Sequence, residues 1–241
     1  MINDLYVKQI DIQKKIPDGN YINALAVVKY LCSNSLVFRK PVTFFVGENG
    51  IGKSTLIEAL AISLGFNPEG GSKNFNFSTA DSHSDLHNYL NVCKGRHAKD
   101  GFFLRAESFY NVASNIDQTE VIKSYGGVSL HAQSHGESFM ALVENRFRGN
   151  GIYILDEPEA ALSPSRIMRL MCCMNEFVKK DSQFIISTHS PILMAFPNAD
   201  IYELNENGIK KIAYKETGHY NITKSFIENP DRMFKYLFEN E

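Results

Sequence analysis

One octapeptide of this chain carries residue types suited to binding phosphate. Residues 47–54 read Gly-Glu-Asn-Gly-Ile-Gly-Lys-Ser and directly follow an apolar run. The glycines let the backbone turn with its N–H groups directed inward, and the helix expected after them presents its positive end. Lys53 can reach the outer phosphates, and the Ser54 hydroxyl can hold Mg²⁺. A glycine-rich turn without a ligand is the alternative, but every fixed position of the phosphate-loop pattern is filled. The predicted nucleoside triphosphate site comprises Gly47, Glu48, Asn49, Gly50, Ile51, Gly52, Lys53, Ser54 and Thr55.

Two acidic residues end a later apolar run and suit metal binding and water activation. Asp156 and Glu157 follow residues 151–155, which read as a strand expected beside the phosphate loop. Asp156 is placed to bind Mg²⁺. Glu157 projects differently and could polarise a water for attack on the γ-phosphate, with charge stabilisation left to the metal and Lys53. Two acids can also simply begin a turn. The phosphate loop upstream favours the catalytic interpretation.

A histidine follows the next apolar run, residues 183–187. His189 stands in the sequence Ser-Thr-His-Ser-Pro, where an imidazole could sense the γ-phosphate. A lone histidine is more often structural, and its ability to change charge proves nothing alone. Its position after a strand end favours the sensor.

A fourth group of residues marks the start of a helix. Ser134 and Glu137 have the spacing of a capping box, and apolar residues follow at helical spacing. A capped helix start is a sufficient structural explanation. The same N-terminus nevertheless exposes free N–H groups and a partial positive charge, which attract anions. Ser134 and Gly136 are therefore candidates for presentation to a phosphate.

An α/β fold with a mostly parallel central sheet would bring these residues together. Short apolar runs predict buried strands, and longer stretches with apolar residues three and four apart predict helices. We expect one domain over residues 1–241, with a polar surface lobe at about 66–135. Strands are predicted at 5–12, 36–39, 41–46, 101–106, 151–155, 183–187, 201–204 and 209–214, and helices at 53–64 and 164–180, followed by one or two short C-terminal helices.

Composition restricts the environment and the partners. The chain has 241 residues and a net charge of −2, so it offers no overall field to attract nucleic acid or an anionic membrane. Contact with DNA or RNA would have to be local and stays open. The four cysteines lack C-x-x-C spacing, which favours a reducing compartment. No apolar run is long enough to cross a bilayer. We expect a cytoplasmic protein without membrane insertion.

The order of these motifs resembles that of the ATP-binding-cassette (ABC) superfamily of ATPases. The phosphate loop is followed by Ser-His-Gly-Glu at 134–137, Asp-Glu-Pro at 156–158 and Ser-Thr-His-Ser-Pro at 187–191. Residues 156–164 look more like the soluble branch than transporter subunits. That branch includes small AAA-labelled ATPases, overcoming-lysogenization-defect and Septu-type ATPases, and is related to SMC-like heads.

The resemblance implies a head-to-tail homodimer that holds two ATP molecules at its interface. Ser134, Gly136 and Glu137 would belong to the signature that completes the partner's site, and residues 159–162 would form the D-loop. It also implies a P-loop NTPase fold with flanking helices, an N-terminal antiparallel β portion and a small signature-bearing helical lobe.

Two departures from the family pattern bear on mechanism. His135 occupies a signature position that is usually glycine. The glutamine of the Q-loop is replaced by Glu107 or by Arg105, and we assign Glu107 as an additional metal ligand. Either residue would change how Mg²⁺ binding is reported to the lobe.

The sequence is compatible with four functions. The principal hypothesis is a Mg²⁺-dependent ATPase that dimerises on ATP and drives or gates a partner, in DNA-linked or antiphage processes. The alternative is a slowly hydrolysing, nucleotide-gated module that regulates a separate effector or toxin protein. A transporter subunit is weakened by the D-loop and the Q-loop. A small-molecule kinase is weakest, since Asp156 and Glu157 suit water activation.

Overall fold

The structure, a computed structural model, describes residues 5–73, 84–117 and 129–238. Parts of the predicted lobe, residues 74–83 and 118–128, therefore lie outside the described residues.

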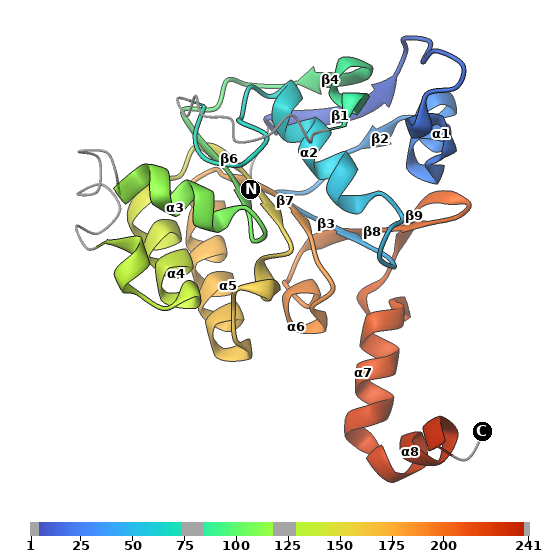
Figure 1. The fold of residues 1–241 in the computed structure, drawn as a ribbon, viewed down its shortest axis with the longest axis vertical. Coiled ribbons are helices and arrows are strands. Elements are labelled where there is room, and N and C mark those ends of the chain that lie inside the picture. The colour runs from blue at the N-terminus through green and yellow to red at the C-terminus, as the bar shows by residue number, and fades with distance from the viewer. Residues whose placement is uncertain (1–4, 74–83, 118–128, 239–241) are drawn as a thin grey trace.

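A mostly parallel sheet forms the centre of the described molecule (Figure 1). Its strand order is β5-β6-β7-β3-β8-β9, and only the β8–β9 pair is antiparallel. Every residue of β3, β6 and β7 is buried, because both faces of the sheet are covered. The bounds are β3 Val42–Val46, β5 Asp100–Arg105, β6 Gly151–Asp156, β7 Gln183–Ser187, β8 Ala199–Asn205 and β9 Gly208–Ile212. The predicted α/β fold with a mostly parallel sheet is confirmed.

A small antiparallel sheet of order β2-β1-β4 covers one side of the molecule. Its strands are β1 Val7–Ile12, β2 Leu36–Val37 and β4 Leu90–Lys94. The N-terminal antiparallel portion is thus confirmed. Within the predicted surface lobe, residues 84–94 form the turn η2 (Asp85–Asn88), which buries Leu86, and the strand β4, which pairs along β1 and was not predicted. The bounds of the lobe stay a prediction. Most side chains of β4 are exposed, so its sequence looked like a polar loop.

Helices fill the two layers on either side of the central sheet. The phosphate-loop helix α2 (Lys53–Ser63) and α1 (Ala26–Ser33) share a hydrophobic core with the antiparallel sheet and Phe45 of β3. Phe44 points the opposite way, into a second core with the remaining helices of the body, since successive strand side chains alternate faces. Those helices are α3 Phe109–Asp117, α4 His135–Arg146, α5 Pro164–Lys179 and α6 Pro191–Met194. Short 3₁₀ turns are η1 Tyr21–Ala24, η4 Leu130–Ala132 and η5 Pro158–Ala160.

The register of the sheet aligns the carboxyl ends of neighbouring strands. Arg105 at the end of β5 lies opposite Asp156 at the end of β6, and Asp156 lies opposite Ser187 at the end of β7. Ser187 is in turn opposite Phe45, close to where β3 enters the phosphate loop. Residues distant in the chain therefore meet at one edge of the sheet.

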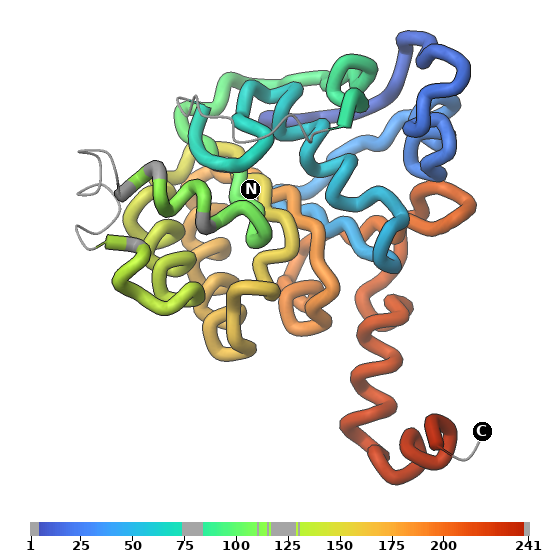
Figure 2. Tube along the Cα trace, in the orientation of Figure 1, coloured from blue at the N-terminus to red at the C-terminus, as the bar shows by residue number. Residues whose placement is uncertain are grey.

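The C-terminal helices extend away from the body (Figures 1 and 2). They follow the predicted hairpin, whose second strand ends at Ile212 rather than Tyr214. The turn η6 (Tyr214–Glu216) begins there because the Glu216 carboxylate accepts the Ala213 N–H at 3.0 Å. Helices α7 (Gly218–Glu228) and α8 (Pro230–Phe238) contain no buried residue and expose several large apolar side chains. No helix in the described ranges is long and apolar enough to span a membrane.

Candidate functional site

The phosphate loop has the backbone that its glycines predict. Gly47, Gly50 and Gly52 have φ values of 141°, 79° and 101°, a region that other residues rarely adopt. Gly47 is also constrained by packing, because a Cβ there would lie 2.3 Å from the carbonyl oxygen of Leu204 in β8. The loop therefore rests against the neighbouring strand at the carboxyl edge of the sheet.

Lys53 curls over the loop that it follows. Its side-chain ammonium donates hydrogen bonds to the carbonyl oxygens of Gly47 and Glu48, both at 2.9 Å. Burial lowers the pKa of Lys53, while the nearby carboxylates of Glu157 and Asp156 act in the opposite direction. The lysine is thus held at the loop in a position from which a phosphate can replace the carbonyl oxygens as its partner.

Asp156 and Ser54 lie together where the sequence predicted a metal. The Ser54 hydroxyl donates to Asp156 Oδ1 at 3.2 Å, and the Ser187 hydroxyl donates to the same oxygen. Asp156 is only 4% exposed, and this burial raises its pKa, against the opposing hydrogen bond of Ser187 and charge of Arg105. A hydroxyl and a carboxylate are hard oxygen donors of the kind that Mg²⁺ prefers.

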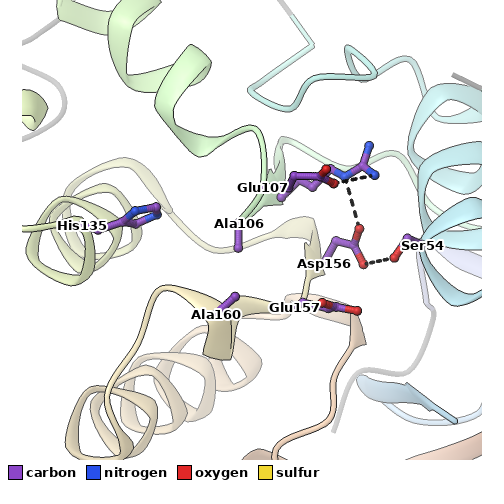
Figure 3. A pocket seen from close by; sticks show the side chains of 8 residues that line it. Ser54, Ala106, Glu107, His135, Asp156, Glu157 and Ala160 are labelled. Atoms are coloured by element: carbon purple, nitrogen blue, oxygen red, sulfur yellow. Dashed lines mark hydrogen bonds and ion pairs between the residues drawn. The ribbon is translucent and has the colours of Figure 1, made fainter. Parts of the chain in front are cut away.

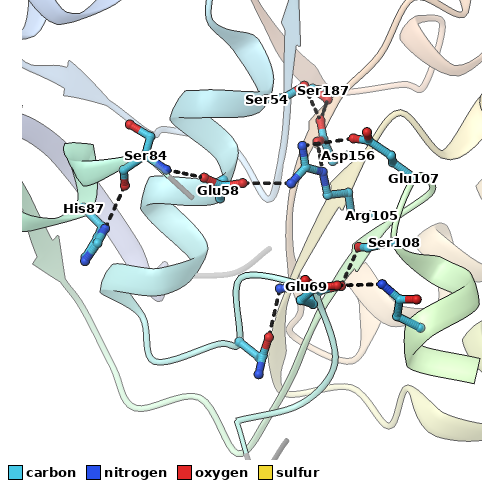
Figure 4. A network of polar contacts seen from close by, with 12 residues as sticks. Ser54, Glu58, Glu69, Ser84, His87, Arg105, Glu107, Ser108, Asp156 and Ser187 are labelled. Carbon is cyan, nitrogen blue, oxygen red and sulfur yellow. Dashed lines mark hydrogen bonds and ion pairs between the residues drawn. The ribbon is translucent and has the colours of Figure 1, made fainter. Parts of the chain in front are cut away.

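Arg105 supplies positive charge beside Asp156 at this edge (Figure 4). Its Nε lies 3.5 Å from Asp156 Oδ2, and its Nη1 donates to Glu58 Oε2 in α2 at 2.8 Å. Its Nη2 lies 3.1 Å from Glu107 Oε2, and the Glu107 side chain is 81% exposed. The structure therefore pairs Glu107 with Arg105 beside the site, and its predicted role as a metal ligand stays a prediction.

Two hollows share Ser54 and Glu157. One, of about 130 Å³, lies over the phosphate loop and is lined by Asn49, Gly50, Gly52, Lys53, Ser54, Thr55 and Glu157. The other, of about 260 Å³, is lined by Ser54, Arg105, Ala106, Glu107, His135, Asp156, Glu157 and Ala160 (Figure 3). The residues predicted to bind phosphate and those predicted to bind Mg²⁺ thus border adjoining spaces.

Glu157 adopts an unusual backbone conformation directly after β6. Its φ and ψ are 49° and 53°, in the left-handed region, which costs a non-glycine residue about 1 kcal/mol or more. Its N–H donates to the carbonyl oxygen of Ser187 at 3.1 Å, which holds the turn. The 39% exposed carboxylate is thereby aimed differently from that of buried Asp156, as the sequence predicted.

His189 lies beside Glu157. Its Nε2 is 3.5 Å from Glu157 Oε1, and its Nδ1 is 2.9 Å from Nε2 of His219 at the start of α7. The Glu159 carboxylate fixes the backbone here, since it accepts the His189 N–H and, at 2.9 Å, the Thr188 hydroxyl. Burial lowers the pKa of His189, and the ammonium of Lys53 lowers it further.

The predicted signature residues form the start of α4. The Glu137 carboxylate accepts the Ser134 N–H at 3.0 Å and the Ser134 hydroxyl at 2.6 Å, so the capping pair exists. A Cβ on Gly136 would lie 2.9 Å from the carbonyl oxygen of Ala161, which packs the segment after η5 against this helix. His135 stacks on Phe109, with ring centroids 5.3 Å apart, and lines the larger hollow.

Two family models match overlapping parts of the chain. One, described as "AAA domain", matches residues 28–146, and the other, described as "AAA domain, putative AbiEii toxin, Type IV TA system", matches residues 128–195. The structure of cbiO1 from Clostridium perfringens, part of the ABC transporter complex cbiONQ, has the same fold. It superposes with a TM-score of 0.50 at 16% identity and covers 97% of this chain and 99% of that one. The chain is therefore similar to AAA-labelled domains in sequence and to an ABC ATPase in fold.

The chain is also similar to one solved domain and to one longer protein. The SMC head domain from Thermotoga maritima has a TM-score of 0.47 at 15% identity, covering 86% of this chain and 98% of that one. The nucleoside import ATP-binding protein NupA of Lactococcus lactis is 25% identical over 78% of this chain. The matched part is 40% of NupA's length, so this chain spans well under half of that relative.

The structure groups most of the predicted site residues. Lys53, Ser54, Asp156, Glu157 and His189 meet at the carboxyl edge of the sheet. Ser134 and Glu137 bond to each other instead, and neither Ser134 nor Gly136 lines the described hollows. Their role, and those of the other site residues, stay predictions.

Sequence reasoning missed three residues at this edge. Glu58 accepts a hydrogen bond from Arg105, Ser187 donates one to Asp156, and His219 contacts His189. Glu58 is the one acidic residue of α2 and lies among its apolar residues, and this position in the sequence was a signal that could have found it. Nothing in the local sequence marks His219.

Replacing Arg105 with glutamine should destabilise the nucleotide-free protein and enlarge the stabilisation given by Mg²⁺ and nucleotide. Removing one partner of a buried ion pair costs about 3–5 kcal/mol, and we expect about 1–3 kcal/mol because Arg105 is 23% exposed. A bound cation would compensate Asp156 in its place. Denaturant unfolding with and without Mg²⁺–nucleotide measures both quantities.

Arg169→Gln is the matched control, because Arg169 pairs with Glu144 and is 64% exposed. It should lose under about 1 kcal/mol, with no change in the ligand-dependent gain. An Arg105→Gln protein that gains no more from Mg²⁺–nucleotide than the wild type would contradict the proposed compensation.

Proposed function

We propose that this chain is a Mg²⁺-dependent ATPase that closes as a head-to-tail homodimer around two ATP molecules. The grouping of Lys53, Ser54, Asp156 and Glu157 at one sheet edge is the observation that carries the proposal. ATP hydrolysis would drive or gate a separate partner protein in the cytoplasm. Contact with nucleic acid is not needed for this activity.

The residues present fit both cofactors. Gly47, Gly50 and Gly52 carry no side chains, so triphosphate oxygens can approach the backbone N–H groups of the loop at these positions. Ser54 and Asp156 would hold Mg²⁺ through oxygen atoms. Arg105 compensates the negative charge of Asp156 here, and a bound cation could do the same. When bound, the metal would neutralise charge that develops on the phosphate oxygens.

The chain's own side chains would perform the remaining steps. Lys53 would exchange its carbonyl partners for phosphate oxygens. The Glu157 carboxylate would accept the proton of the attacking water, for which it has the exposure that buried Asp156 lacks. His189 would donate from Nε2 to the γ-phosphate, toward which its neighbour Glu157 also faces.

The start of α4 would complete the site of the second copy. Its capped N-terminus is exposed at Ser134 and offers partial positive charge to an anion. To reach a phosphate, the Ser134 hydroxyl must leave the Glu137 carboxylate, which accepts it here. This exchange would tie dimer closure to the presence of the partner's nucleotide.

A mixing experiment tests the shared site. Lys53→Ala and Ser134→Arg proteins should each be inactive alone, since each spoils both sites of its own homodimer. A one-to-one mixture should recover up to about a quarter of wild-type sites, because half of the dimers are mixed and hold one intact site. Phosphate release before and after mixing is the measurement.

Lys53→Ala mixed with Glu157→Gln is the control for the mixing experiment. Both changes affect the same half of a site, so their mixed dimers contain no intact site and should stay inactive. A Lys53→Ala and Ser134→Arg mixture that is no more active than this control would contradict the head-to-tail arrangement.

A nucleotide-gated module that hydrolyses slowly is the second candidate. Three contacts favour this candidate: Lys53 with the Gly47 carbonyl oxygen, Ser134 with Glu137, and Asp156 with Arg105. Each of these contacts must break before its residue can bind nucleotide or metal, which would slow hydrolysis. The toxin–antitoxin wording of one matching family model agrees with a separate effector or toxin protein as its target. Single-turnover hydrolysis slower than nucleotide release would favour this candidate.

A further inference from the structure

His219 lies outside every motif, yet it contacts the candidate γ-phosphate sensor. It is the second residue of α7, and its Nε2 lies 2.9 Å from Nδ1 of His189. The ring centroids are 5.0 Å apart and the planes cross at 66°, so the contact is made edge-on through nitrogen rather than by stacking.

The start of α7 is fixed by local hydrogen bonds, which hold His219 in place. Thr217 is fully buried, and its hydroxyl accepts the Tyr220 N–H at 3.2 Å and donates to the Tyr214 carbonyl oxygen at 2.8 Å. The turn η6 precedes it directly. The imidazole of His219 is therefore presented from a defined helix start and not from a free chain end.

A hydrogen bond between two neutral imidazoles needs one N–H donor and one bare nitrogen. Burial lowers the pKa of both rings, which favours the neutral form of each. If Nδ1 of His189 donated, its Nε2 would be a lone pair facing the Glu157 carboxylate at 3.5 Å. If His219 donates, Nε2 of His189 carries the proton and faces that carboxylate favourably.

The Nε2 atom of His189 is buried and has no hydrogen-bond partner among the described residues. A buried polar atom without a partner is costly and rare in folded proteins. If Nε2 of His189 carries a proton, that N–H has no acceptor at hydrogen-bond distance among the described residues. It could therefore donate to an oxygen of a bound ligand.

We propose that His219 is a positioning residue that donates from its Nε2 to Nδ1 of His189 and so keeps the proton of His189 on Nε2, directed at the nucleotide. The proposal rests on the proposed function of His189 as γ-phosphate donor. His219 would act through His189 and not on the nucleotide itself.

The tautomer can be read directly from the histidine ring nitrogens by ¹⁵N NMR of the nucleotide-free protein. The expected spectrum shows the shared proton bonded to Nε2 of His219 and a second proton on Nε2 of His189. A shared proton bonded to Nδ1 of His189 would overturn the proposal, whatever the enzymatic activity.

Kinetics provide the second readout through two substitutions of similar length. His219→Gln keeps an N–H donor near Nε2, whereas His219→Met has none. We expect kcat to fall about tenfold in His219→Met, less than for outright loss of a transition-state donor, with KM for ATP little changed. His219→Gln should retain most of the wild-type kcat.

Lys224→Met is the control for a methionine on α7, because Lys224 is exposed on the same helix. It should behave as wild type. Equal losses in His219→Gln and His219→Met would indicate a merely structural role and overturn the proposal, as would wild-type kcat in His219→Met. If Glu157→Gln still hydrolyses ATP, the proposed function fails instead, and the NMR result stands on its own.

Discussion

Replacing Glu157 with glutamine is expected to lower ATP hydrolysis by about 10²–10⁴-fold, the usual contribution of a general base. ATP binding should persist, because glutamine has the same shape and leaves Lys53, Ser54 and Asp156 in place. Without hydrolysis, the closed ATP-bound dimer should accumulate. Phosphate release and light scattering with ATP and with ADP measure the two effects.

The substitution should leave the fold intact. Glutamine meets the same backbone strain as glutamate at φ 49°, and its amide can still face His189. Glu206→Gln, in the exposed turn of the β8–β9 hairpin, is the control for a lost carboxylate. A Glu157→Gln protein that stays monomeric with ATP and turns over normally would refute the assigned base.

Replacing Lys53 with alanine is expected to weaken ATP binding by at least about 100-fold, equivalent to about 2.7 kcal/mol. The ammonium is buried at the loop and is placed to neutralise phosphate charge. Titration calorimetry with ATP measures the affinity. Hydrolysis at saturating ATP should also fall, because the same charge stabilises the transferred phosphoryl group.

Unfolding experiments separate lost binding from lost structure in Lys53→Ala. The nucleotide-free ammonium is partly compensated by two carbonyl oxygens, and burial lowers its pKa, so its removal should change stability by no more than about 1–2 kcal/mol. Lys210→Ala, an exposed lysine on β9, is the control. Nearly normal ATP affinity in folded Lys53→Ala would contradict the phosphate site.

Local sequence pattern was sufficient to predict the central part of the fold and the residues at its carboxyl edge. Runs such as 42–46, 151–155 and 183–187 are mostly apolar, which is typical of short strands covered on both faces. Chemically active residues follow each run directly. Parallel strands then bring Lys53, Asp156 and His189 together without further information.

Tertiary contacts account for what the sequence did not reveal. Strand β4 was missed because most of its side chains are exposed, and it is a strand only because β1 offers a free edge. Arg105 approaches Asp156 through strand register, and Glu58 approaches Arg105 from α2. His219 reaches His189 only after the β8–β9 hairpin returns the chain to the same edge. No spacing rule could indicate these pairs.

The attachment of the C-terminal helices has a thermodynamic consequence. Every residue from 221 to 230 is exposed, so most of α7 and the start of α8 add nothing to the core. The first turn of α7, where His219 bonds His189, joins these helices to the body. If a partner that binds α7 and α8 changes the affinity for nucleotide through this turn, then by reciprocity the nucleotide changes the affinity for that partner by the same factor.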